Sequence, residues 1–114
     1  MSVDLSEYEE SGVRVIVVNG TLDAPGTMSI EDDLLASLRG ETRPVILDLS
    51  QLDYLSSYGL RMVSTAGKLM LESGSRMVLA EPNEHVMQII NIAGYDTVIP
   101  VFGSLDDALH ACAG

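Results

Sequence analysis

Aromatic residues are scarce in this 114-residue chain, which has no tryptophan, one phenylalanine and four tyrosines. Aromatic platforms that stack bases or sugars are therefore not expected. The chain has one cysteine, Cys112, and so no disulfide within itself, which fits a reducing compartment. Residues 1–5 carry no basic region, and no stretch approaches 18 uninterrupted apolar residues. We expect a cytoplasmic protein with no secretory signal and no membrane-spanning helix.

Positive charge is also scarce. Six Lys and Arg residues stand against 17 Asp and Glu residues, which gives a net charge of 6 − 17 = −11. Such a surface repels phosphate backbones and anionic lipid headgroups, so neither nucleic acid nor a membrane is an expected partner. A basic patch on a protein partner would be attracted to it. A simpler interpretation is that the acidity only contributes solubility.

Motifs for metal, cofactor or catalytic chemistry are missing as well. His85 and His110 each stand alone, with no cysteine or acidic residue at ligand spacing, so we expect no metal. The sequence contains no phosphate-binding loop, no dinucleotide-binding glycine pattern and no triad-like spacing. Cys112 is interpreted as a packing residue on the last helix. These absences favour a binding protein without a cofactor over an enzyme.

Apolar residues make up 46% of the chain, and their periodicity predicts one α/β domain over residues 1–114. Strands alternate with helices after an initial antiparallel hairpin, which predicts a mixed, mostly parallel sheet with about four helices. Residues 20–26 are predicted to be a loop, and residues 52–59 a turn. The expected strands are 3–8, 13–18, 44–49, 77–80 and 98–101, the last at a sheet edge, and the expected helices are 28–39, 57–73, 83–93 and one beginning at 104.

The functional crevice of such a sheet lies beyond the carboxyl ends of its strands, which places the loop 20–26 and the turn 52–59 there. We predict that Ser57 is the N-cap of the long helix that follows the turn. A helix N-terminus stabilises an added anion, and a phosphate adds about −1.5 to −2 charge at pH 7. Phosphorylation of Ser57 would therefore be tolerated and would change which partner binds. The simpler alternative is an ordinary structural cap.

Four segments carry a resemblance to a known family: GTLD at 20–23, LDLSQLDYLSSYGLR at 47–61, AGYD at 93–96 and SLDDAL at 104–109. They resemble the STAS domain of bacterial anti-sigma-factor antagonists over nearly the whole chain. The resemblance implies a STAS-like fold. It also implies partner switching, in which the unphosphorylated antagonist binds an anti-sigma factor that is also a serine kinase of the GHKL type, and frees the sigma factor. Phosphorylation ends this complex, and a PP2C-type phosphatase restores it.

The resemblance also implies the site residues. The family's acceptor serine lies two residues before a glycine, which here is Ser57 before Gly59, and Ser56 is a second candidate acceptor. Asp23 matches an aspartate that lies beside the acceptor at the partner surface. The expected partner-binding residues are Asp23, Ala24, Ser56, Ser57, Tyr58, Gly59 and Arg61.

Two other functions remain open on the sequence alone. A STAS-type module can bind a ligand, or serve as a structural subunit of a transporter or signalling complex without phosphorylation. Ser56 and Tyr58 favour this alternative, because typical antagonists have Asp before the acceptor and a small residue after it. A third hypothesis is an enzyme with Ser57 as nucleophile, but such a serine needs a general base, and neither histidine is near it in sequence.

Overall fold

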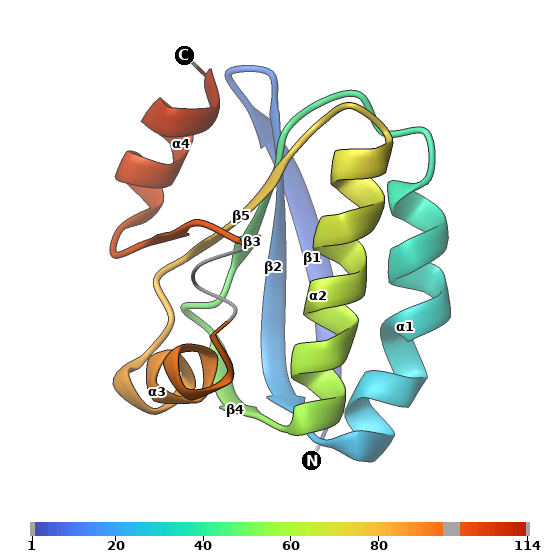
Figure 1. Cartoon of the computed structure of the whole chain (residues 1–114), viewed down its shortest axis with the longest axis vertical. Coiled ribbons are helices and arrows are strands. Elements are labelled where there is room, and N and C mark those ends of the chain that lie inside the picture. The colour runs from blue at the N-terminus through green and yellow to red at the C-terminus, as the bar shows by residue number, and fades with distance from the viewer. Residues whose placement is uncertain (1, 95–98, 114) are drawn as a thin grey trace.

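The structure, a computed structural model, describes residues 2–94 and 99–113. These residues form a six-stranded mixed sheet and four helices (Figure 1). The α/β class and the number of helices agree with the sequence prediction. In chain order the elements are β1 (Val3–Glu10), β2 (Val13–Leu22), α1 (Ala24–Leu38), β3 (Val45–Asp48), β4 (Leu52–Leu55), α2 (Ser57–Glu72), β5 (Met77–Ala80), α3 (Glu84–Ala93), β6 (Val101–Phe102) and α4 (Leu105–Ala113).

The predicted hairpin is confirmed. β1 and β2 are antiparallel, and the turn between them contains Ser11 and Gly12, with φ of 54° and 78°. Two consecutive positive φ angles are typical of a type I′ turn, whose twist matches that of the two strands. The remaining pairs are parallel, and the main path of the sheet runs β1-β2-β3-β5-β6, with β4 paired to β2.

Both faces of the sheet are buried, as the continuous apolar strands predict. In β3, Val45 and Leu47 point to the core beneath α1, α2 and α3, whereas Ile46 points to the opposite core beneath α4. Figure 1 shows α4 apart from the other helices, on its own side of the sheet. The helices α1 and α2 run side by side, and both begin at the same end of the molecule.

α1 begins at Ala24, four residues before the predicted start, so the prediction of a loop over residues 20–26 is wrong at its end. Asp23 is the N-cap, and Pro25 lies within the first turn, where a missing N–H costs no helical hydrogen bond. Glu31, Asp32 and Asp33 therefore lie beyond the first turn of the helix.

β4 corrects the prediction of an uninterrupted turn over residues 52–59. This short strand pairs with the last residues of β2, Gly20 to Leu22, past the point where β3 has ended. The strand expected over residues 98–101 is observed as β6, and it is at the sheet edge as expected. Val98 itself lies outside the described residues.

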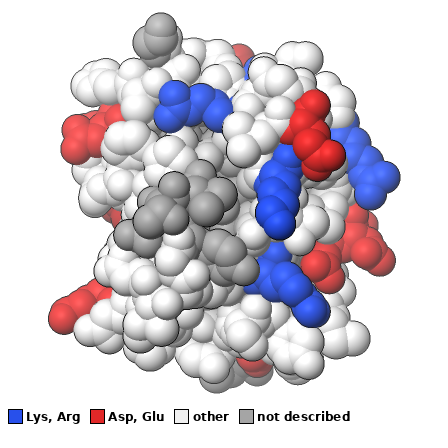
Figure 2. All heavy atoms as spheres, viewed as in Figure 1, with Lys and Arg blue, Asp and Glu red and all other residues white. Residues whose placement is uncertain are grey.

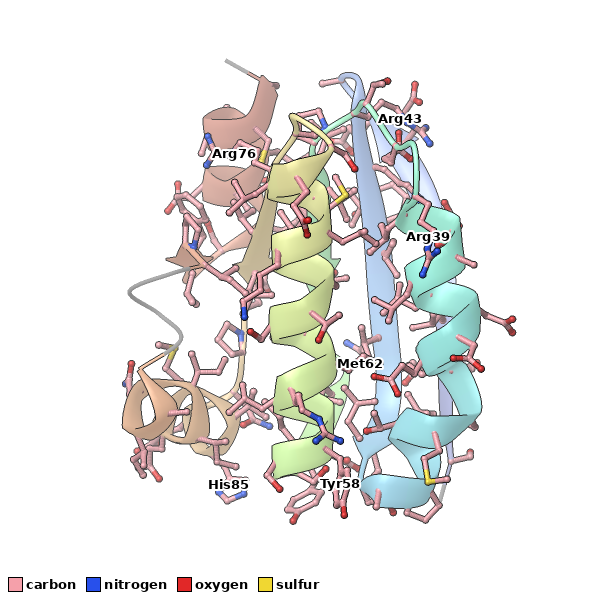
Figure 3. All side chains as sticks on the ribbon, turned by 45° about the vertical axis from the view of Figure 1, so that its right-hand side comes forward. Arg39, Arg43, Tyr58, Met62, Arg76 and His85 are labelled. Atoms are coloured by element: carbon pink, nitrogen blue, oxygen red, sulfur yellow. The ribbon has the colours of Figure 1, made fainter. Side chains whose placement is uncertain are left out.

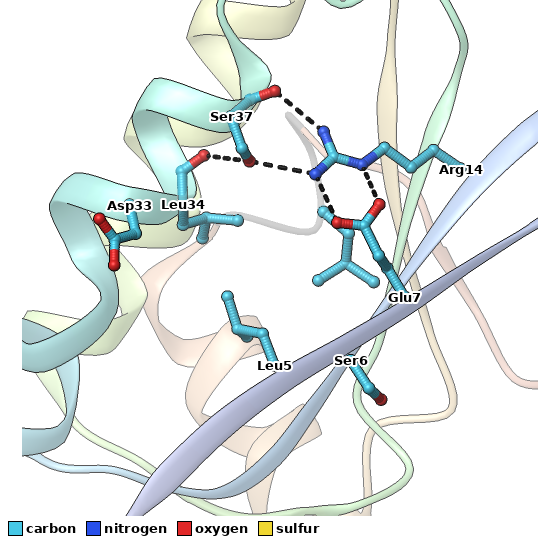
Figure 4. A pocket seen from close by; sticks show the side chains of 8 residues that line it. Leu5, Ser6, Glu7, Arg14, Asp33, Leu34 and Ser37 are labelled. Atoms are coloured by element: carbon cyan, nitrogen blue, oxygen red, sulfur yellow. Dashed lines mark hydrogen bonds and ion pairs between the residues drawn. The ribbon is translucent and has the colours of Figure 1, made fainter.

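An ion-pair cluster joins β1, β2 and α1. The guanidinium of Arg14, which is 6% exposed, donates to both carboxylate oxygens of Glu7 at 2.7 and 2.9 Å and to the backbone carbonyl of Ser37 at 3.0 Å (Figure 4). Glu41 is 3.3 Å from Arg14 and 2.8 Å from Arg43. The hydrogen bond from the Arg43 side chain is the main reason why the pKa of Glu41 falls to about 2.

Candidate functional site

The starts of α1 and α2 meet at the carboxyl ends of β2 and β4. Leu22 and Leu55 are register partners in these two parallel strands. The backbone N–H of Ser56, the next residue after β4, donates to the carbonyl oxygen of Leu22 at 2.9 Å. Segments that are more than thirty residues apart in sequence are thereby joined at one edge, seen at the bottom of Figure 1. We call this the helix-start edge, and define it by residues 22–28 and 54–61.

Ser56, and not Ser57, is the N-cap of α2, so that prediction is wrong. The Ser56 hydroxyl accepts a hydrogen bond from the Gly59 N–H at 3.2 Å and donates one to the Leu22 carbonyl at 2.7 Å. Which of two adjacent serines caps the helix is set by the pairing of β4 with β2, because that pairing brings the Leu22 carbonyl within reach of Ser56. The Ser56 hydroxyl is therefore engaged in the fold.

Ser57 is the first residue of α2, and its side chain is exposed. Within residues 2–94 and 99–113, its hydroxyl has no hydrogen-bond partner. It lies at the end of the helix where backbone N–H groups lack intrahelical partners and the helix dipole is positive. An anion attached to this oxygen would be stabilised by both effects.

Asp23 caps α1 as Ser56 caps α2. Its carboxylate accepts a hydrogen bond from the Gly26 N–H at 2.7 Å, and both Asp23 and the following Ala24 are half-buried. Because Asp23 follows Leu22 directly, it lies next to the residue that anchors Ser56. The structure therefore brings Asp23 and Ser56 to the same edge and assigns each a capping role that sequence reasoning had not given to Asp23.

Gly59 allows α2 to lie close to the sheet. A Cβ atom at Gly59 would come within 2.9 Å of both the Leu22 Cβ and the Leu55 Cδ1. Real Cβ atoms do not approach other heavy atoms so closely, so either the helix start or the strands would have to move. The packing of α2 on the sheet therefore requires glycine at position 59, whether or not Gly59 also contacts a partner.

Aromatic side chains are exposed beside Ser57. The Tyr58 ring is 50% exposed, and the Arg61 guanidinium carbon lies 5.4 Å from its centroid, within range of a cation–π interaction. Tyr54 stacks on His85 of α3 with ring centroids 6.2 Å apart. Figure 3 shows His85 and Tyr58 at the same end of the molecule. Exposed aromatic rings beside polar groups are typical of protein-binding surfaces.

Sequence reasoning missed Met28 and Tyr54 at the helix-start edge, and also His85 of α3, which stacks on Tyr54. Met28 is 73% exposed on α1, although it was expected merely to begin that helix. Tyr54 was assigned to a turn, but in β4 it points outward while Leu52 and Leu55 point inward. Residues 52–55 are only four in number and show no regular alternation of buried and exposed positions, so no local pattern identified the strand.

The other candidate groups lie elsewhere. No group of three or more His, Cys, Asp or Glu side chains within the described part of the chain is arranged to hold a metal ion. Cys112 packs against the core beneath α4, and burial raises the pKa of its thiol. The carboxylate of Asp48 accepts a hydrogen bond from the Ser50 N–H at 2.9 Å, so it orders the loop after β3.

Residues 5–108 match the family model described as STAS domain. The chain belongs to the STAS domain family. This STAS domain is 32% identical over 100 residues to a protein named putative anti-sigma factor antagonist BtrV from Bordetella bronchiseptica, covering 88% of this chain and 86% of the relative.

Two solved proteins share the fold of this STAS domain. A putative anti-sigma factor antagonist from Thermotoga maritima superposes with a TM-score of 0.89 at 17% identity, over 96% of this chain and 95% of that one. The anti-sigma factor antagonist SpoIIAA of Bacillus in its unphosphorylated form gives 0.76 at 16% identity, over 96% and 94%. Among the residues that the structure describes, no helix is long and apolar enough to cross a membrane.

Proposed function

We propose that this STAS domain is an anti-sigma-factor antagonist, a cytoplasmic binding module and not an enzyme. Its helix-start edge binds an anti-sigma factor that is also a GHKL-type serine kinase, and this binding frees the sigma factor. The kinase transfers the γ-phosphoryl group of ATP to the Ser57 Oγ, which loses its proton, and ADP leaves. A PP2C-type phosphatase hydrolyses the phosphoester and restores binding. The relative named anti-sigma factor antagonist supports this role.

The observation that carries the proposal is the contrast between two adjacent serines. The Ser57 hydroxyl is exposed and has no hydrogen-bond partner among the described residues. The Ser56 hydroxyl donates to Leu22 and accepts from Gly59, so a phosphate there would break the bond to Leu22. Ser57 is therefore the better acceptor. A catalytic nucleophile at Ser57 would need a general base beside it. No described side chain is hydrogen-bonded to Ser57, so the enzyme alternative has no such base.

The unmodified edge offers apolar area for a partner. Tyr54, Tyr58 and Met28 are all exposed there, and aromatic residues and methionine are enriched in the cores of protein interfaces. Asp23 and Arg61, which are also expected to bind the partner, contribute polar groups at the same edge, and Arg61 lies over the Tyr58 ring.

Phosphorylation changes binding without unfolding the domain. The phosphate lies at the N-terminus of α2, where the helix dipole stabilises it. It adds about −1.5 to −2 charge at pH 7 to an edge that also carries Asp23, on a chain of net charge −11. Burying that charge in an interface has a large desolvation cost, and an acidic partner surface is repelled. The complex therefore dissociates.

Binding to purified GHKL-type kinases of the same organism tests the proposal, with isothermal titration calorimetry as the readout. Ser57→Ala should bind as the wild type does and accept no phosphate from ATP. Ser57→Asp should lose at least tenfold in affinity. Ser73→Asp adds the same charge at the other end of α2 and should bind normally.

Mass spectrometry of the kinase reaction then identifies the modified residue. Phosphate on Ser57 supports the proposal, and phosphate on Ser56 contradicts the assignment of the acceptor. Full binding by Ser57→Asp, together with no phosphate on Ser57, contradicts the switch. That result would favour a STAS module that binds its partner or ligand without phosphorylation.

A further inference from the structure

β1 is an outer strand of the sheet. It pairs with β2 on one side, and no described strand lies on its other side. Just before this strand, the carbonyl oxygen of Ser2 accepts a hydrogen bond from the N–H of Thr21 at 3.1 Å. Hydrogen-bonded and non-hydrogen-bonded pairs alternate along two antiparallel strands. The β1 residues whose backbone groups face away from β2 are therefore Val3, Leu5, Glu7 and Glu9.

The outward backbone groups of β1 are a template for a further strand. On that side, none of them is hydrogen-bonded to a residue within 2–94 or 99–113. A row of such N–H and C=O groups on an outer strand can pair with an extended segment of another chain. β1 is eight residues long, so a guest strand could form several of these bonds. Backbone pairing supplies affinity, and the side chains beside the strand decide which sequence binds.

A hollow of about 240 Å³ lies between β1 and α1. Its apolar lining comes from three elements: Leu5 of β1, Ile16 of β2 and Leu34 of α1. Figure 4 shows Leu5 and Leu34 on its two sides. Residues directly opposite each other on neighbouring strands point to the same face of a sheet. A guest residue opposite Leu5 would therefore point to the face of this hollow, where an aliphatic side chain would bury apolar surface.

The two elements beside the hollow are acidic. β1 contains four Asp and Glu residues and α1 contains three, and neither element contains a Lys, Arg or His. Among the described residues, only Glu7 and Glu9 of these seven form ion pairs. Figure 2 shows acidic side chains over α1, at the right of that view. A basic segment would be attracted to this surface. The seven residues are Asp4, Glu7, Glu9, Glu10, Glu31, Asp32 and Asp33.

The same charge disfavours a second copy of this chain as the guest. Pairing of β1 with the β1 of another copy would place the four carboxylates of each strand against those of the other. Like charges on neighbouring strands are destabilising, and each copy has a net charge of −11. The guest is therefore a basic segment of a different protein.

We propose that β1 binds an extended basic segment of a partner protein as an additional antiparallel strand. Antiparallel pairing is chosen because it is the more stable per residue. One aliphatic side chain of the segment enters the hollow opposite Leu5, and basic side chains lie beside Glu7, Glu9 and Asp33. None of the residues that line the hollow belongs to the helix-start edge. This second binding surface does not depend on the proposed switch at Ser57.

The blocked peptide acetyl-Lys-Arg-Thr-Lys-Thr-Leu-Lys-Val-amide is the probe. Paired antiparallel to β1, it places its leucine opposite Leu5 and basic residues opposite Glu7 and Glu9. NMR titration should give saturable shifts of amides in β1 and α1. Hydrogen exchange at the amides of Leu5, Glu7 and Glu9 should slow at least about fivefold. The amides of Ser6 and Tyr8, which face β2, should change little.

Two N-methylated forms of the peptide separate backbone pairing from attraction between charges. Methylation of the peptide nitrogens opposite Leu5 and Glu7 removes two donors that face β1, and should weaken binding about tenfold or more. Methylation opposite Ser6 and Tyr8 leaves the charge and composition the same, but those nitrogens face away from β1. This matched control should bind nearly as well as the unmethylated peptide.

Variants of the protein test the charge beside the hollow. Asp33→Lys should lower the affinity for the peptide about tenfold, because it reverses an exposed charge that lines the hollow. Glu72→Lys makes the same change of charge at the exposed end of α2 and should bind like the wild type. Ser57→Ala should also bind the peptide normally, which keeps this test distinct from that of the switch.

Three results would overturn the proposal. Absence of a saturable shift would mean that the acidic residues only protect β1 from pairing. Equal binding by the two N-methylated peptides would mean that charge alone holds the peptide. Dimerisation of the protein through β1, measured by sedimentation and by slowed exchange of the outward amides without peptide, would mean that a second copy is the guest.

Discussion

The hydroxyl oxygen of Ser56 and the carbonyl oxygen of Leu22 lie 2.7 Å apart, and this hydrogen bond ties the start of α2 to the end of β2. The same hydroxyl caps the helix by accepting from Gly59. One side chain therefore satisfies two backbone groups at the edge where a partner is expected, while the hydroxyl of its neighbour Ser57 has no hydrogen bond to a residue that the structure describes.

Ser56→Ala is expected to lower the free energy of unfolding by about 1–2 kcal/mol, because the helix loses its cap and the Leu22 carbonyl loses a donor. Urea denaturation followed by circular dichroism measures this. Ser73→Ala, which removes an exposed hydroxyl at the other end of α2, should change stability by less than about 0.5 kcal/mol. Equal effects of the two variants would show that the Ser56 bonds are not stabilising.

Gly59→Ala should destabilise the domain by about 1–3 kcal/mol, since the new methyl group would overlap Leu22 and Leu55. The sign is informative, because Gly→Ala within a helix is otherwise stabilising by up to about 1 kcal/mol. Gly103→Ala, where nothing lies within 4 Å of the added carbon, is the matched control. Thermal denaturation of both variants decides the point, and a more stable Gly59→Ala would refute the close packing.

Acid should weaken the domain through Glu41 and Glu7. The hydrogen bond from Arg43 lowers the pKa of Glu41 from 4.5 to about 2, and the one from Arg14 lowers the pKa of Glu7. A carboxylate whose pKa is depressed in the folded state contributes stability above the unfolded value, and that contribution is lost as the pH falls. Stability should thus decline between about pH 4.5 and pH 2.

Glu41→Gln isolates this effect. It should lower stability at pH 7 by about 1–2 kcal/mol and flatten the decline between about pH 4.5 and pH 2. Glu72→Gln, at an exposed residue that forms no ion pair with the described residues, should leave the profile unchanged. An unchanged slope in Glu41→Gln would mean that its ion pairs do not stabilise the fold.

Tyr58→Ser tests the exposed ring beside the proposed acceptor, and it depends on the proposed function. The variant should bind the partner about tenfold more weakly, because exposed aromatic residues are frequent anchors of interfaces. Its stability should be nearly that of the wild type, since the ring is 50% exposed. Tyr8→Ser, at a tyrosine of similar exposure on β1, is the control. Tighter binding by Tyr58→Ser would instead show that the ring obstructs the partner.

Much of the fold could be predicted because the relevant signals are local. The apolar runs of β2, β3 and β5 and the helical periodicity of α2 and α3 are each strong over their own length. α4 begins where it was predicted, and the Ser104 hydroxyl accepts a hydrogen bond from the Asp107 N–H at 3.1 Å. The resemblance to the family indicated Ser57, two residues before Gly59, as the acceptor, and that assignment stays a prediction.

The errors occurred where local rules compete. Proline and glycine usually interrupt a helix, but Pro25 lies in the first turn of α1, where its missing N–H costs no helical hydrogen bond. Gly26 is required there because a Cβ atom at this position would lie 2.5 Å from the Thr21 carbonyl oxygen. β4 has only four residues, so its identity as a strand depends on its pairing with β2.

The amino-acid sequence by itself determined the order of the helices and of every strand except β4, because each of these segments carries its own regular spacing of apolar residues. Tertiary structure decided that Ser56, and not its neighbour Ser57, hydrogen-bonds through its hydroxyl to the described residues. It also paired β4 with the last residues of β2. Both outcomes depend on contacts between segments that are distant in sequence. The geometry of these contacts follows from how the strands and α2 pack together, and no local sequence pattern contains it.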